Sequence, residues 1–170
     1  MSERDFLALP EEKPYLELVD GVVEQKPMVS KEHGRLIGEL SGHLFVYERQ
    51  IRRTGGVFGP EVRVRLDARN YYLPDNSYWA PEAESGDDST PTVAVEVRSP
   101  NQSMTKLREK CRRYLAAGSA AAWLIDPKAR TIEVFEAAGT RTLRKGDTLT
   151  SEAMPGFELA LDDLFAVLDR

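Results

Sequence analysis

The stretch 91–118, PTVAVEVRSPNQSMTKLREKCRRYLAAG, constrains the fold more than any other part of the chain. In its first half, Val93, Val95 and Val97 alternate with smaller or charged residues, among them Glu96. A period of two is typical of a β-strand that directs the valines to one face and Glu96 to the other. The second half has apolar residues at helical spacing, so a helix follows the strand. A strand and a helix that each have one apolar side predict a layered α/β architecture.

Lys110 lies at the edge of the apolar stripe of that helix, which is expected to begin near Met104 and to end at Gly118. Glu96 is placed to be its anion, because the end of a strand and the inner flank of the next helix lie close together in an α/β layer. A solvated strand face and a lysine that extends its ammonium into water are equally compatible with this stretch. Tyr114, one turn after Lys110, is expected to pack against the sheet.

The rest of the chain predicts a mixed sheet with helices packed on it. The pair Asp20-Gly21 separates two short apolar runs and favours a β-hairpin, because a type I′ turn needs positive φ. The expected elements are a hairpin over 16–25, a helix over 33–52, strands over 61–66, 73–79 and 121–125, a hairpin partner over 131–136 and a closing helix over 159–168. The fold class is therefore α/β (α+β), with a mixed central β-sheet flanked by helices and an N-terminal β-hairpin.

A length of 170 residues predicts one domain, 1–170, with a core from about residue 15 to residue 168. The charged N-terminal segment lacks the apolar centre of a signal peptide, and no run approaches the ~18 apolar residues of a membrane span. The single cysteine, Cys111, excludes an intramolecular disulfide and is expected in the core. We therefore expect a cytoplasmic protein without a membrane partner.

The formal net charge of −5 argues against a protein that binds nucleic acid with its whole surface, because counterion release requires clustered cations. A local patch is compatible with the sequence. The helix over 104–115 carries Lys106, Arg108, Lys110, Arg112 and Arg113 against Glu109. The alternative is an ordinary solvated helix face. His33 and His43 are ten residues apart, a spacing that does not place two imidazoles on one helix face for zinc.

Asp75, Glu96 and Lys110 are each expected at the end or the flank of an element. Hydrolysis of a phosphodiester needs such a set: hard oxygen ligands for magnesium, and a cation that orients water and offsets developing negative charge. These three residues therefore form the candidate catalytic centre.

Several short motifs are spaced along the chain. They are Leu18-Val19-Asp20-Gly21, His33, Pro74-Asp75, Glu96-Val97-Arg98-Ser99-Pro100, Lys110 with Tyr114, Trp123, Asp126-Pro127 and Pro155-Gly156-Phe157. Together they resemble the Uma2 family of endonucleases over the range from about Leu16 to Leu168. That family is similar in fold to the restriction-endonuclease-like nucleases of the PD-(D/E)XK superfamily, so the resemblance implies this fold.

The resemblance implies that Asp75 and Glu96 bind Mg²⁺ or Mn²⁺ and that the carbonyl of Val97 adds a ligand. Lys110 is then the nuclease lysine, supplied by the helix instead of the strand, and it positions water or stabilises the transition state. The implied partner is DNA, and a homodimer would match the two-fold symmetry of a duplex.

The chain departs from the nuclease pattern at Arg98, which stands two residues after Glu96 where that motif has lysine. Arginine stays protonated at any useful pH, so Arg98 can stabilise charge but cannot act as a base. The resemblance also places His33 near the site, together with Glu17 or Glu24 of the hairpin. The alternative role for His33 is that of a capping or core-edge histidine.

Three functions are compatible with these observations. The first is a magnesium-dependent endonuclease that hydrolyses phosphodiester bonds of DNA. The second is a binding or assembly protein that keeps the nuclease fold without turnover, which the acidic composition and Arg98 favour. The third is a metal-assisted hydrolase of a small phosphate ester, which needs less basic surface than DNA does.

Overall fold

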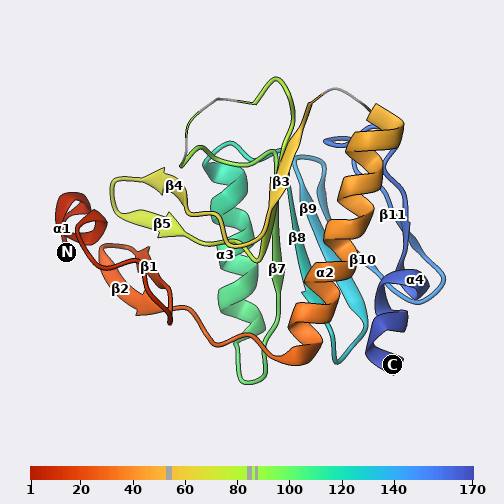
Figure 1. The fold of residues 1–170 in the computed structure, drawn as a ribbon, viewed down its shortest axis with the longest axis horizontal. Coiled ribbons are helices and arrows are strands. Elements are labelled where there is room, and N and C mark those ends of the chain that lie inside the picture. The colour runs from red at the N-terminus through yellow and green to blue at the C-terminus, as the bar shows by residue number, and fades with distance from the viewer. Residues whose placement is uncertain (53–54, 84–85, 87) are drawn as a thin grey trace.

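A six-stranded sheet forms the centre of the computed structural model, which describes residues 1–52, 55–83, 86 and 88–170 (Figure 1). The strand order is β10-β9-β8-β7-β6-β3. Strands β7 (Val93–Val97) and β8 (Ala121–Asp126) run parallel, whereas the other neighbouring pairs of this sheet are antiparallel. The predicted mixed sheet is therefore confirmed.

Short strands complete this sheet and form two smaller ones. The central sheet also contains β3 (Val57–Gly59), β6 (Asn76–Trp79), β9 (Thr131–Glu136) and β10 (Gly139–Leu143). A four-stranded sheet of order β2-β1-β5-β4 contains β1 (Leu16–Val19), β2 (Val22–Gln25), β4 (Val64–Asp67) and β5 (Asn70–Tyr72). Strands β11 (Thr148–Leu149) and β12 (Leu159–Ala160) pair with each other.

Helices α2 (Lys31–Val46) and α4 (Leu161–Ala166) pack on one face of the central sheet, and α3 (Met104–Ala116) packs on the other. The short helix α1 (Glu3–Leu7) packs against the four-stranded sheet, where Phe6 lies with Leu18 and Tyr71. Helix α2 continues into a π-helical turn, Tyr47–Arg52, and α4 continues into a 3₁₀ turn, Val167–Asp169. None of the helices that the structure describes combines the length and apolar character that crossing a membrane requires.

The alternation of β7 divides its side chains between two hydrophobic clusters. Val93, Val95 and Val97 are buried in the cluster that also contains Leu40 of α2 and Leu164 of α4. The opposite face of the strand packs against α3, as the period of two predicts.

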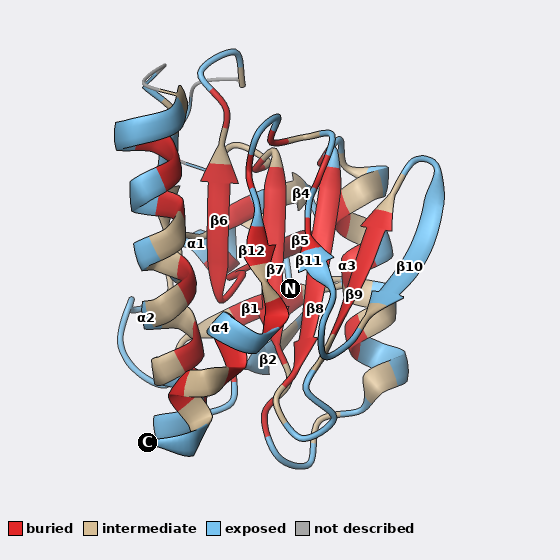
Figure 2. Cartoon of the chain, turned by 90° about the vertical axis from the view of Figure 1, so that its right-hand side faces the viewer, coloured by how far each residue is buried: buried red, intermediate tan, exposed pale blue. Residues whose placement is uncertain are grey.

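The α3 side of the sheet forms the second cluster. Here Ala94 of β7 lies with Leu107, Cys111 and Tyr114 of α3. Figure 2 shows that β6, β7, β8 and β9 are buried along most of their length. Cys111, which the sequence predicts to lie in the core, has no exposed surface, and neither has Trp123 of β8.

The structure departs from the predicted boundaries where the backbone turns or changes partner. The strand predicted over 61–66 begins only at Val64, because Glu61 has a positive φ that interrupts the extended run. The strand predicted over 73–79 begins at Asn76, after Pro74, which lacks the N–H that a sheet ladder needs. The closing helix begins at Leu161, because residues 159–160 pair with β11 instead.

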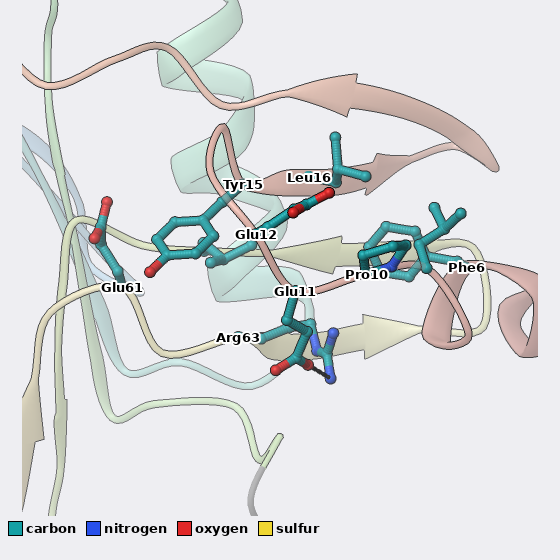
Figure 3. Close-up of a pocket in the computed structure, with 10 residues that line it drawn as sticks. Phe6, Pro10, Glu11, Glu12, Tyr15, Leu16, Glu61 and Arg63 are labelled. Atoms are coloured by element: carbon teal, nitrogen blue, oxygen red, sulfur yellow. Dashed lines mark ion pairs between the residues drawn. The ribbon is translucent and has the colours of Figure 1, made fainter.

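A pocket of about 250 Å³ lies between the N-terminal segment and the four-stranded sheet (Figure 3). Glu11, Glu12 and Glu61 line it, and Arg63 forms an ion pair of 2.8 Å with Glu11. Leu73 also lines this pocket, and its backbone N–H and carbonyl bind side chains of the candidate active site. The two regions are therefore neighbours that both contact Leu73.

Gly56 is expected to be essential for stability, because a Cβ atom there would overlap Glu48 Oε1 and would lie 2.7 Å from the Tyr78 hydroxyl oxygen. Glu48 is buried, accepts from the Tyr78 hydroxyl and accepts from the Gly56 N–H at 3.1 Å. Gly56→Ala should lower the free energy of unfolding by about 1–3 kcal/mol.

The matched control is Gly42→Ala, at an exposed position of α2 with open space around the Cβ. This variant should raise the free energy of unfolding by about 0.5–1 kcal/mol. Urea unfolding measures both, and equal stability of the two variants would contradict this account.

Candidate active site

Asp75 lies directly before β6, at the end where this strand meets the end of β7. Its Oδ2 accepts the backbone N–H of Val97 at 2.7 Å. The residue is only 3% exposed, although carboxylates are rarely buried without partners. The antiparallel pairing of β6 with β7 therefore brings Asp75 beside the end of the strand that carries Glu96.

Glu96 projects from β7 towards α3 and is also 3% exposed. Its Oε1 accepts the hydroxyl of Tyr114 at 2.6 Å and lies 2.9 Å from Lys110 Nζ. Helix α3 presents these two side chains one turn apart, and the Ser103 side chain caps the helix by accepting the Lys106 N–H. The structure therefore pairs the buried Glu96 with the largely shielded Lys110, whose side chain is 14% exposed, so the expectation of a solvated strand face is wrong.

The hairpin β1–β2 supplies a third carboxylate, that of Glu17. Its Oε1 accepts from Lys110 Nζ at 2.8 Å and from the backbone N–H of Leu73 at 2.7 Å. The hairpin reaches the site because β1 pairs with β5, where Leu18 lies opposite Tyr71. Of the two hairpin acids considered from the sequence, Glu17 therefore joins the site, whereas Glu24 is exposed.

Sequence reasoning missed Lys26, which follows β2 and is buried. Its Nζ lies 2.7 Å from Asp75 Oδ1 and donates to the carbonyl of Leu73 at 2.5 Å. A lysine at the end of a short strand is ordinary in sequence, so no local pattern marked it. Only the docking of the hairpin against Leu73 and Asp75 shows its place.

His33 also contacts Asp75, with 3.3 Å between Nε2 and Oδ1. Its Nδ1 lies 3.4 Å from the hydroxyl oxygen of Ser99. The Ser30 side chain caps α2 by accepting the backbone N–H of His33, which fixes the histidine in the first turn. The ring is buried, so the structure places His33 beside the carboxylate, as the resemblance implies.

All of these groups line one small cavity of about 20 Å³. Its walls comprise Glu17, Lys26, Pro27, His33, Asp75, Glu96, Val97, Ser99, Gln102 and Lys110. This volume is sufficient for one water molecule or one small ion.

A family model described as "Uma2: Putative restriction endonuclease" matches residues 4–162. The chain belongs to the Uma2 family. Among solved structures, "a putative nuclease belonging to DUF820 from Anabaena variabilis ATCC 29413" is similar over 99% of both chains, with 24% sequence identity and a TM-score of 0.86. The likeness to this structure shows the fold, which is of the restriction-endonuclease-like kind, and the family description supports a nuclease-like function. A search of curated proteins finds no match.

The pKa values of the two buried carboxyl groups of this Uma2 protein are shifted in opposite directions. Burial raises the pKa of Glu96 above its ordinary value, even with Lys110 beside it. At Asp75 burial acts in the same direction, but Lys26 and His33 outweigh it and hold the pKa well below the usual range. Carboxylates with divergent pKa values are typical of functional sites.

The pKa of Lys110 lies well above its ordinary value. Burial alone would lower this pKa, but the carboxylates of Glu17 and Glu96 more than offset the burial. The ammonium therefore stays charged at any useful pH. It has three N–H groups, and two are accounted for by Glu17 and Glu96. In this Uma2 site the Lys110 ammonium is placed to orient or stabilise an anion.

The donor set of the cavity fits a magnesium ion. Asp75, Glu96 and Glu17 present hard carboxylate oxygens to it. Within the described residues, no group of three or more His, Cys, Asp or Glu side chains is placed so that it could hold a metal ion by itself. Mg²⁺ does not need one, because one or two carboxylates commonly hold it together with water and substrate phosphates.

The side chain of Arg98 does not line the small cavity that Lys110 lines. Its Nη1 lies 2.8 Å from Asp126 Oδ2 at the end of β8, and its Nε donates to the carbonyl of Gln102 at 3.3 Å. The side chain lines a neighbouring cavity of about 640 Å³ together with Lys128 and Arg130. The structure therefore brings Asp75, Glu96, Lys110, His33 and Val97 together at the small cavity, whereas the Arg98 side chain lies outside it, against Asp126.

The carboxylate of Asp126 is expected to make a stability contribution that depends on pH. Burial raises its pKa, but N–H groups of Ala129 and Lys128 and the guanidinium of Arg98 outweigh burial and lower the pKa. A depressed pKa in the folded state stabilises the protein above the ordinary pKa of about 4, and this contribution is lost as the pH falls through the folded-state pKa.

Asp126→Asn should therefore lower the free energy of unfolding by about 1–3 kcal/mol at pH 7. The difference from the wild type should shrink at pH 3, because the carboxylate of the unfolded chain has the higher pKa and takes up a proton first. Urea unfolding at both pH values measures this change. A difference that does not vary with pH would show that the charge of Asp126 has no role.

Proposed function

We propose that this Uma2 protein is a metal-dependent endonuclease that hydrolyses phosphodiester bonds of DNA. The observation that carries the proposal is the convergence of two buried carboxylates and one permanently charged lysine on a single ion-sized cavity. Asp75 and Glu96 are the proposed ligands of Mg²⁺ or Mn²⁺, with the Val97 carbonyl as a further ligand. When bound, such an ion supplies a Lewis acid and lowers the pKa of water.

Lys110 is proposed to act through its charge. Two carboxylates fix its position, and its remaining N–H is available to a water molecule or a phosphate oxygen in the cavity. A fixed cation in a site from which water is largely excluded stabilises developing negative charge strongly, because no reorganisation is needed during the reaction.

His33 is proposed to keep the Asp75 carboxylate in place. With a proton on Nε2, the ring donates to Asp75 while Nδ1 accepts from the Ser99 hydroxyl. This arrangement uses both nitrogens of a neutral imidazole. It leaves His33 as a positioning residue, and it accounts for a buried histidine at the start of α2.

A groove of about 710 Å³ beside the cavity supports a polymeric substrate. It runs between the hairpin and α3 and shares Glu17, Gln102 and Lys110 with the small cavity. Lys106, Arg112 and Arg113 add cationic side chains along it, although Glu24 and Glu109 line it as well. A space of this size next to the carboxylates suits a nucleic-acid strand better than an isolated small ester.

Competition separates DNA from a small phosphate ester as substrate. Hydrolysis of bis-p-nitrophenyl phosphate in Mg²⁺ would be measured with and without an excess of single-stranded or duplex DNA. The proposal predicts slow turnover of the small ester and inhibition by DNA that weakens as salt increases. Fast turnover of the small ester with no inhibition by DNA would overturn the assignment of substrate.

A further inference from the structure

Lys26 is a buried cation that neither the sequence motifs nor the family description assigns to the site. Its side chain is 6% exposed, and its ammonium contacts one carboxylate oxygen, Asp75 Oδ1, and one carbonyl, that of Leu73. Two of its three N–H groups are therefore accounted for, and the side chain also lines the small cavity. A metal ion that binds Asp75 would need this same oxygen, Oδ1.

The charges around the cavity are almost balanced without a metal. Glu17, Asp75 and Glu96 supply three carboxylates, and Lys26 and Lys110 supply two ammonium groups. A divalent ion added to this set would leave one positive charge in excess inside a buried site. Since uncompensated buried charge is costly, one ammonium has to leave its carboxylate when the ion binds.

The contacts indicate which ammonium leaves. Lys110 is held by two carboxylates, at 2.8 and 2.9 Å, and lies 5.2 Å from the centre of the Tyr72 ring. Lys26 is held by one carboxylate and one neutral carbonyl. An ammonium between two carboxylates is bound more strongly than one beside a single carboxylate, so the ammonium of Lys26 is held less strongly than that of Lys110.

We propose that Lys26 occupies the cation position on Asp75 in the metal-free protein and competes with the divalent ion for this carboxylate. The inference rests on the proposed function, because it takes Asp75 as a metal ligand. Lys26 thereby keeps the buried carboxylate paired when no ion is bound. Binding of the ion releases its ammonium from Asp75.

The test is calorimetric titration of Mn²⁺ into the full chain without DNA. Lys26→Gln removes the charge but keeps an N–H group that can donate to the Leu73 carbonyl. It should bind Mn²⁺ about tenfold more tightly than the wild type, because the competitor is gone. Lys26→Arg keeps the charge at the same position and should bind no more tightly than the wild type. Lys145→Gln changes an exposed lysine in the turn before β11 and should leave the affinity unchanged.

An affinity of Lys26→Gln equal to or weaker than that of the wild type overturns the inference. Because no DNA is present, this result is distinct from a failure of the proposed nuclease activity. A second measurement uses the wild type alone, so it does not depend on the folding of a variant. The NMR signal of the Lys26 ammonium should shift when Mg²⁺ is added, and an unchanged signal at saturating Mg²⁺ overturns the inference as well.

Discussion

Replacement of Glu96 by glutamine is expected to lower DNA cleavage by roughly a thousandfold or more, because a charged group of the catalytic centre is lost. Glutamine has nearly the same shape and still accepts the hydroxyl of Tyr114, which is 2.6 Å from Oε1 in the wild type. The contact between β7 and α3 is therefore kept. Initial rates on supercoiled plasmid, Mn²⁺ titration and circular dichroism together measure activity, metal binding and fold.

The matched control for this variant is Glu133→Gln. Glu133 is a buried acid of β9 that pairs with Leu124, and Leu124 in turn lies opposite Glu96. Its carboxylate binds Arg108 at 2.6 Å, away from the small cavity. This variant should keep its cleavage rate within about twofold, as is typical of a substitution that leaves the transition-state contacts unchanged. Equal losses in both variants would show that the effect belongs to any buried acid of the sheet.

Substitution of Lys110 by methionine is expected to lower the free energy of unfolding by about 3–5 kcal/mol, because it removes the cation shared by two buried carboxylates. Glu17 and Glu96 both contact Lys110 Nζ, at 2.8 and 2.9 Å. Without the ammonium, the carboxylates repel each other in a site that water hardly reaches. Urea unfolding at pH 7 gives the change, and the plasmid assay should show loss of cleavage in the same variant.

Two comparisons show whether the charge is responsible. Arg112→Met changes a side chain of the same helix that is 59% exposed, and it should alter stability by no more than about 0.5 kcal/mol. Glu17→Gln in the Lys110→Met background removes one of the repelling charges and should recover part of the lost stability. A double variant that is as unstable as the single variant would show that lost packing, and not charge, destabilises the protein.

The sequence predicts the part of the site that one strand and one helix determine. The alternation of β7 correctly places Glu96 on the face opposite Val95, and the helical period places Lys110 on the flank that faces this strand. These relations depend on residues less than twenty positions apart, so local periodicity is sufficient. The fold class follows from the same segment together with the buried strand β8.

Local patterns do not predict the contribution of the hairpin. Glu17 and Lys110 are 93 residues apart, and their contact depends on the pairing of Leu18 with Tyr71. Lys26 reaches Asp75 through the same docking. The direction of Arg98 also depends on a distant partner, because Asp126 at the end of β8 binds its guanidinium. Distant pairings of this kind are set by the packed structure, and a single sequence does not show them.

The most direct test of the central claim is the metal dependence of plasmid cleavage by the wild-type protein. The protein would be stripped with EDTA and then supplied with Mg²⁺ or Mn²⁺ at low salt, with Glu96→Gln alongside. The account predicts no cleavage in EDTA, nicking and linearisation by the wild type after metal is restored, and no cleavage by the variant. An inactive wild type with both metals would contradict the account and favour a nuclease fold that serves only in binding.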